Sequence, residues 1–190
     1  SNFKKMRNYL LGIFFLTNLT LFSQVDLEKN FMIDLNSYTE AYNQGDWGTV
    51  SSMWNPKLFE IAPKEQLIGV FEMMSQMGMN MKINILGIEK ISNIIRHEDS
   101  DYCRIDYKAN TVIELSGDML AAIEELKQNF IRIHGQDAVK FDENTIYINA
   151  IQSMIAVKFE KEWKYSEISK ENTQAIEMII PEKVFNQLNK

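Results

Sequence analysis

The sequence predicts an α+β protein in which N-terminal helices pack on a long, bent antiparallel sheet. Three observations predict this class. Apolar residues recur at helical spacing between residues 26 and 77, and the apolar period changes to two after residue 78. Only one later segment that lies between strands, residues 118–134, returns to helical spacing. We therefore expect helices first, then a sheet with one helix inserted between its strands.

The N-terminal helices are predicted from apolar stripes and from capping residues. Apolar and aromatic residues recur every three or four positions over residues 26–42, and Gly45 then suits a C-terminal cap. Asp46 can cap a short second helix that runs through Met53. Pro63 suits the first position of a third helix to about residue 77, with an inner face of Leu67, Phe71 and Met74.

The first two strands are predicted from alternation of apolar and polar residues. The first runs from about residue 80 to residue 94, and the apolar set changes parity after Gly87, as at a β-bulge. The second covers residues 102–115. One of its faces carries Cys103, Ile105, Tyr107, Ala109, Thr111, Ile113 and Leu115, while Arg104, Asp106, Lys108 and Glu114 take the other, which we expect to be solvated.

The rest of the chain predicts the inserted helix, more strands and a short final helix. Helical spacing covers residues 118–134, ending at Gly135. Residues 139–141 and 146–148 predict a hairpin, and residues 151–159 pair with residues 163–168. Pro181 can begin the last helix. With no repeat and no linker, residues 24–190 are expected to form a single domain.

Residues 1–23 have the order of a secretory signal peptide. Lys4, Lys5 and Arg7 precede an apolar run over residues 9–22, and Ser23 provides a small residue at the expected cleavage site. The run is shorter than the roughly 20 residues that a spanning helix needs, although a buried helix is the alternative. We expect export to the periplasm or the extracellular space, with no stable membrane anchor after cleavage.

The net charge, the cysteine count and the methionines limit which partners, disulfides and metals are expected. The formal charge is −6, and cleavage would remove three basic residues, so neither nucleic acid nor an anionic membrane is an expected partner. Cys103 is the only cysteine and cannot form an intramolecular disulfide. The methionines between residues 73 and 81 could bind Cu(I) through thioethers, but packing explains them better. No metal and no cofactor are expected.

The element order over residues 26–168 resembles the nuclear transport factor two-like superfamily, which includes ketosteroid isomerase and scytalone dehydratase. A local pattern adds to the resemblance: Tyr38 and Tyr42 on the first helix, followed by Gly45, Asp46 and Trp47 at its turn. The helix over residues 118–134 departs from the simplest version of that fold. The leader and its Phe22, Ser23, Gln24 ending resemble exported proteins of flavobacteria and their relatives. The resemblance implies a pocket between the concave sheet face and the first helices.

The pocket candidates are the side chains expected to face that space: Tyr38, Tyr42, Phe71, Tyr107 and Thr111. No catalytic residue is predicted, because Asp106 and Glu114 lie on the opposite strand face and neither histidine, His97 or His134, has a catalytic partner nearby. Trp47, Trp54 and Trp163 fit core anchors, and lining a pocket mouth is equally compatible.

We expect an exported, non-enzymatic binding or interaction domain for a small apolar ligand, a peptide or a second copy of itself, as in a homodimer. The alternative is a lyase or isomerase that uses the same cavity. A carboxylate or histidine beside Tyr107 would favour the enzyme, whereas an entirely apolar lining would favour binding or a filled core.

Overall fold

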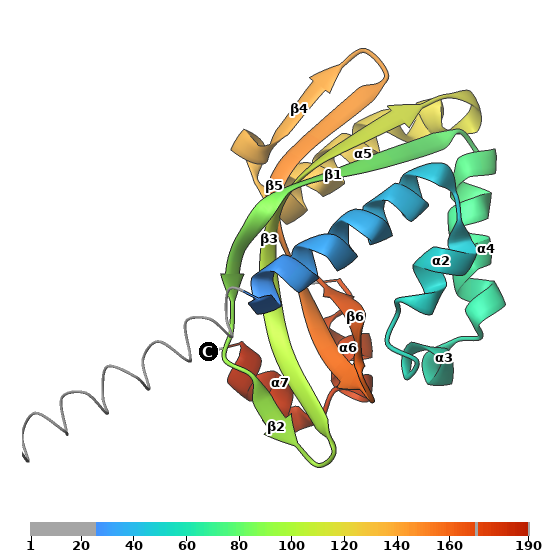
Figure 1. Ribbon diagram of the computed structural model, residues 1–190. Coiled ribbons are helices and arrows are strands. Elements are labelled where there is room, and N and C mark those ends of the chain that lie inside the picture. Colours follow the sequence, from blue (N-terminus) through green and yellow to red (C-terminus); the bar gives the residue numbers. More distant parts are fainter. Residues whose placement is uncertain (1–25, 170, 190) are drawn as a thin grey trace, which may run out of the picture. The chain divides into compact units, whose positions relative to one another are not determined.

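The computed structural model describes residues 26–169 and 171–189 (Figure 1), so the predicted leader and its cleavage site lie outside the described part. The chain divides into two compact units, Ser1–Leu35 and Asn36–Lys190. Of the first unit, the described part, residues 26–35, is helical. All the strands and the helices from α2 onward belong to the second unit.

The three predicted helices are confirmed, with a short additional one. Residues 26–44 are helical, and Gly45 ends that helix with a φ of 72°, a conformation that glycine adopts without strain. α2 (Trp47–Ser52) is capped by Asp46, whose carboxylate accepts a hydrogen bond from the Thr49 backbone N–H at 3.1 Å. α3 (Leu58–Ile61) was not predicted, and α4 (Lys64–Gln76) follows Pro63.

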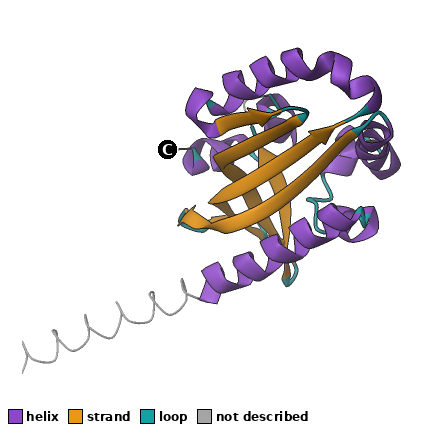
Figure 2. Cartoon of the chain, turned by 90° about the horizontal axis from the view of Figure 1, so that it is seen from above, coloured by secondary structure: helices purple, strands orange, loops and turns teal. Residues whose placement is uncertain are grey.

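The strands form one six-stranded antiparallel sheet. Its central order is β1-β3-β5-β4, with β2 paired to β3 and β6 paired to β5. Register shifts between Ile85 and Gly87 and between Ile88 and Lys90 confirm the predicted bulge. The segments predicted as separate strands over residues 146–148 and 151–159 form one strand, and Figure 2 shows the long strands curving together. The strands are β1 (Met79–Ile91), β2 (Ile95–His97), β3 (Ser100–Leu115), β4 (Val139–Asp142), β5 (Thr145–Phe159) and β6 (Glu162–Ile168).

The two faces of β3 separate as predicted. All seven residues from Cys103 to Leu115 at odd positions are buried, and we call the face of the sheet that carries them the inner face. The inserted helix is confirmed as a 3₁₀ turn, η1 (Gly117–Ala122), followed by α5 (Ile123–His134). Apolar side chains of both elements pack against a buried cluster of Met79, Ile113, Leu115, Val139, Ile146 and Ile148.

The opposite, outer face is covered at one end of the sheet, which corrects the expectation that it is solvated. α6 (Thr173–Ile179) and α7 (Glu182–Leu188) lie over it and share a buried cluster with Tyr102, Ile155 and Val157. Beside them Arg104 pairs with Asp106 at 2.7 Å and donates to Asn189 Oδ1 at 2.6 Å. Both faces of β5 are therefore buried over residues 154–157.

Among residues 26–169 and 171–189, none of the helices combines the length and apolar character that crossing a membrane requires.

Candidate functional site

A cluster of aromatic side chains gathers where the first helix meets α2 and α4. The Tyr42 ring lies edge-on to Trp47 at 5.2 Å and to Phe71 at 5.9 Å between centroids, and Trp47 stacks on Phe71 at 5.2 Å. The helix end is fixed to the sheet by Asn43, whose side-chain amide exchanges two hydrogen bonds of 2.8 Å with the backbone of Ile83 in β1. The amide thereby satisfies backbone groups on an edge strand.

Trp54 extends this cluster toward β6. The corner that carries it is hydrogen-bonded to β6, because the Asn55 backbone N–H donates to the Tyr165 carbonyl and the Tyr165 N–H donates to the Met53 carbonyl, both at 2.9 Å. The Trp54 indole N–H then donates to the Tyr38 hydroxyl at 3.4 Å, and its ring lies 6.0 Å from that of Phe71. The corner thus brings Tyr38 and β6 close together.

Polar groups of β3 and β5 form a second chain of contacts on the inner face. The buried Tyr107 hydroxyl donates to Gln152 Oε1 at 3.1 Å, and the Gln152 amide nitrogen donates to Thr111 Oγ1 at 3.5 Å. Both bonds cross between neighbouring strands because Tyr107 and Gln152 are paired in the register. The amide is held in one orientation by having a partner at each end.

Glu167 in β6 is a carboxyl group on the same face. It pairs with Met154, which pairs with Ile105, so the register places it two residues along the sheet from the Tyr107–Gln152 pair. The residue is exposed to solvent, yet loss of hydration to the surrounding protein raises the pKa of its carboxyl group. From these two properties together we infer that the carboxyl lies in a recess that water reaches. Among the described residues, none donates a hydrogen bond or an ion pair to its carboxyl oxygens.

The carboxyl and three tyrosines influence one another. Burial and, as the smaller cause, the negative charge of Glu167 together raise the pKa of Tyr42 to about 12. The pKa values of Tyr38 and Tyr107 are also raised, first by burial and then by Glu167. All three phenols therefore remain protonated at ordinary pH and can donate hydrogen bonds. We call Glu167, Tyr38, Tyr42, Tyr107 and the flanking Trp54 and Gln152 the Glu167 recess.

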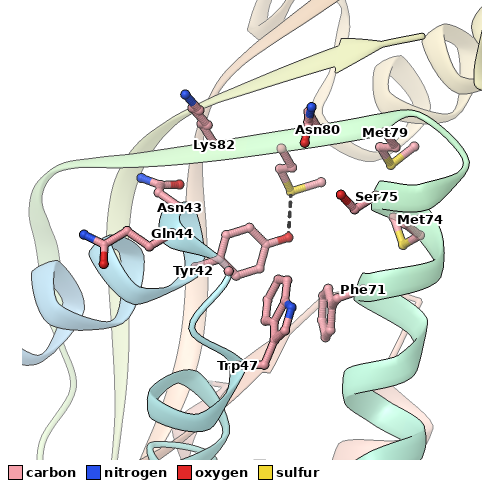
Figure 3. A pocket seen from close by; sticks show the side chains of 12 residues that line it. Tyr42, Asn43, Gln44, Trp47, Phe71, Met74, Ser75, Met79, Asn80 and Lys82 are labelled. Atoms are coloured by element: carbon pink, nitrogen blue, oxygen red, sulfur yellow. Dashed lines mark hydrogen bonds between the residues drawn. The ribbon is translucent and has the colours of Figure 1, made fainter. Parts of the chain in front are cut away.

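A separate pocket of about 220 Å³ opens beside Tyr42 (Figure 3). Its lining comes from the first helix, α2, α4 and β1, and includes Trp47, Phe71, Met74 and Met79. The Tyr42 hydroxyl donates to the Met81 thioether at 3.5 Å, the hydrogen bond that is dashed in Figure 3. Tyr42 therefore lines this pocket and is also one of the tyrosines whose pKa is raised by the Glu167 charge.

The predicted pocket residues fall into two groups. Tyr38, Tyr42 and Phe71 meet in the aromatic cluster, while Tyr107 and Thr111 are joined through Gln152. The sequence did not lead us to Glu167. The carboxyl near Tyr107 that would distinguish an enzyme from a binding domain therefore lies on β6. The signal was present, because Trp163 and Tyr165 alternate and residue 167 shares their parity.

Other candidate groups lie elsewhere. Asp106 points to the outer face as predicted, where it is paired with Arg104. Burial raises the pKa of the Cys103 thiol to about 12, so the thiol stays protonated and unreactive at ordinary pH. Met74 and Met81 pack on the cluster that contains Met79. Within residues 26–169 and 171–189, no three His, Cys, Asp or Glu side chains are arranged to hold a metal ion.

Comparison with known proteins assigns neither a family nor a function to the chain. No protein-family model matches the sequence, and no curated protein matches it either. Among solved structures, the chain is similar to the "putative dehydratase from the NTF2-like family" of Streptomyces avermitilis, with a TM-score of 0.37 and 11% identity. The match covers 74% of this chain and 92% of that one. At that level of similarity no function is transferred, and the fold class that stands is α+β.

Proposed function

We propose that the Glu167 recess binds a small molecule that has an apolar body and at least one hydrogen-bonding group. The supporting observation is the Glu167 carboxyl, which reaches solvent on the inner face and has no donor among the described residues. Structural carboxylates of this kind are normally paired or hydrogen-bonded. A carboxyl without a partner in the described part of the chain is suited to a partner that arrives from solution.

The surroundings of the carboxyl support the same proposal. Aromatic rings of Tyr38, Tyr42 and Trp54 offer apolar surface, and few polar groups, mainly the Tyr107 hydroxyl and the Gln152 amide, could orient a guest. This mixture of apolar lining with a small number of placed polar groups is the usual composition of a small-molecule site. The binding domain expected from the sequence is kept as the first proposal, with Glu167 added to its candidate residues. A carboxyl near Tyr107 also favours the catalytic alternative, which is therefore the second candidate.

A ligand screen tests the proposal. Thermal stabilisation of the full chain by a small-molecule library identifies binders, and each binder is then measured against Glu167→Gln, which keeps the shape and removes the charge. Glu114→Gln is the matched control, because Glu114 is exposed on the outer face. Binding that is weakened by E167Q and unchanged by E114Q supports the recess. Binders that are indifferent to both variants would place the site elsewhere.

A second candidate, a lyase or isomerase, is favoured by the pairing of a carboxyl of raised pKa with protonated phenols. In its ionised form Glu167 would take a proton from a carbon next to a carbonyl, and a tyrosine hydroxyl would donate a hydrogen bond to the carbonyl oxygen as it gains negative charge. An isomerase returns the proton to another carbon, whereas a lyase lets a leaving group depart. Raising the pKa makes the carboxylate a stronger base.

Proton exchange tests the catalytic candidate without knowledge of the substrate. Cyclohexanone in D₂O is incubated with the protein, and loss of its α-proton signal is followed by NMR. Catalysed exchange that disappears in E167Q and rises with pH through the carboxyl's pKa supports the enzyme. Exchange no faster than in buffer removes this candidate and leaves the binding proposal to the ligand screen.

We also propose that the native chain is exported and cleaved after Ser23, as its leader predicts. The intact mass of the protein recovered from the native host tests this. A mass that corresponds to a chain beginning at Gln24, recovered outside the cytoplasm, is expected. Full-length chain recovered from the cytoplasm would contradict it.

A further inference from the structure

We infer that the Glu167 recess selects amines: its ligand carries a protonated nitrogen that pairs with the Glu167 carboxylate while an apolar body lies against the aromatic rings. This inference rests on the proposed small-molecule function and adds to it the charge of the ligand.

The described residues supply no cation to the carboxyl. None of the ion pairs among the described residues includes Glu167, and loss of hydration alone accounts for its raised pKa. On the inner face of β5, Lys158 lies farther along the strand, with its amine over the Trp163 ring at 5.7 Å. The carboxylate therefore has to find its positive partner in the ligand. A charged hydrogen bond between N–H and carboxylate is stronger than a neutral one.

The recess disfavours an anionic guest. Burial and the charge of Glu167 already raise the pKa values of Tyr38, Tyr42 and Tyr107, which means that further negative charge is costly there. A carboxylate ligand would meet the same repulsion and the same loss of hydration. A neutral ligand would gain hydrogen bonds without a charge interaction, whereas an ammonium group gains both.

The aromatic rings beside the carboxyl suit a cation as well. Tyr38 and Tyr42 stack at 6.4 Å between centroids, and the Trp54 indole donates to the Tyr38 hydroxyl. Ring faces attract ammonium groups through their quadrupole, most strongly when water is excluded. A nitrogen held at the carboxylate would thus have aromatic surface within reach of its substituents.

Protons provide a signature of this recognition. An ammonium group favours the ionised carboxyl, so binding releases a proton from Glu167 whenever the empty site is protonated. The other titratable groups that face the recess are the phenols of Tyr38, Tyr42 and Tyr107. On the same face of the sheet lie the Cys103 thiol in β3, the Tyr165 phenol in β6 and, farther along β5, the Lys158 amine. Tyr38, Tyr42, Tyr107 and Cys103 have raised pKa values and stay neutral over the acidic and neutral range. Glu167 alone then makes amine affinity increase with pH.

Three probes of matched shape test the inference: benzylamine, benzyl alcohol and benzoate. Their affinities for the full chain are measured by calorimetry near neutral pH. Benzylamine is expected to bind about tenfold more tightly than benzyl alcohol, the difference between a charged and a neutral hydrogen bond, and benzoate more weakly than either. In E167Q the benzylamine advantage should vanish while benzyl alcohol binding is kept.

The outcomes separate the inference from the proposed function. Benzyl alcohol or benzoate binding as tightly as benzylamine would overturn the selection of amines and leave the small-molecule site standing. Absence of binding by all three would overturn both. If E167Q does not fold, the wild-type chain still decides, because benzylamine affinity must increase from about pH 5 to about pH 8 while benzyl alcohol affinity does not. A benzylamine affinity independent of pH would contradict the role of Glu167.

Discussion

The change Tyr107→Phe removes one hydroxyl from the inner face and almost no volume. The residue is 4% exposed, and its hydroxyl donates to Gln152 Oε1 at 3.1 Å. A neutral hydrogen bond contributes about 0.5–1.5 kcal/mol, and an acceptor left unsatisfied in the interior costs about 1–3 kcal/mol. Gln152 is only half-buried, so water can replace the lost donor. We therefore expect the free energy of unfolding to decrease by about 1 kcal/mol.

Thermal unfolding measures this loss, which corresponds to a decrease in Tm of about 2–4 °C for a chain of this size. The control is Tyr147→Phe, because Tyr147 is 38% exposed on the opposite side of β5 and should lose nothing measurable. An unchanged Tm for Y107F would refute the hydrogen bond between Tyr107 and Gln152. A loss above about 3 kcal/mol in the free energy of unfolding would show that water does not replace the lost donor at Gln152. Clear destabilisation with no effect on any ligand would count against the pocket.

Three further changes test separate features. Because the pKa of Glu167 is raised in the folded chain, its protonated form stabilises the fold at low pH, and that stability is lost as the pH rises through the folded pKa. The Tm of E167Q should therefore rise relative to that of the wild type from about pH 4 to about pH 8. A Tm difference that stays constant over this range would contradict the raised pKa. Ser166 is 1% exposed, and its hydroxyl has no hydrogen-bond partner among the described residues. Ser166→Ala should therefore raise the free energy of unfolding in urea by about 1 kcal/mol. A lower free energy of unfolding would show that the hydroxyl has a hydrogen-bond partner. A Cβ on Gly78, whose φ is 102°, would lie 2.0 Å from the Ser116 carbonyl oxygen. Gly78→Ala should therefore lower the free energy of unfolding by more than about 2 kcal/mol. In the control Gly69→Ala, in α4, the new Cβ meets nothing within 4 Å, so this change should be stabilising or neutral.

Local patterns predicted most of the fold, because they depend on residues close in sequence. The cap at Asp46, the stop at Gly45 and the alternation of β3 each follow from a few neighbouring residues, and each is confirmed. The burial of the outer face by α6 and α7 could not be predicted in the same way. It depends on pairing Tyr102 with Val157 and on docking helices from about 80 residues further along the chain.

The candidate site was predicted only in part for the same reason. Tyr38, Tyr42 and Tyr107 follow from helical and strand periodicity. Glu167 interrupts an apolar alternation with a charge, and a single charge on a short strand usually indicates the solvent side. Its place on the inner face depends on the β5–β6 register, which long-range pairing determines. Functional groups often break a local pattern in this way.

The two-sided burial of β5 has a consequence for the order in which the chain can fold. Residues 154–157 belong to a strand whose inner side can pack early, but Ile155 and Val157 on the outer side are covered only by residues 176–188. Until those last residues arrive, the growing chain presents an apolar strip beside Tyr102 that other unfolded chains could join. A chain truncated after residue 169 would keep every strand of the sheet and should nevertheless aggregate.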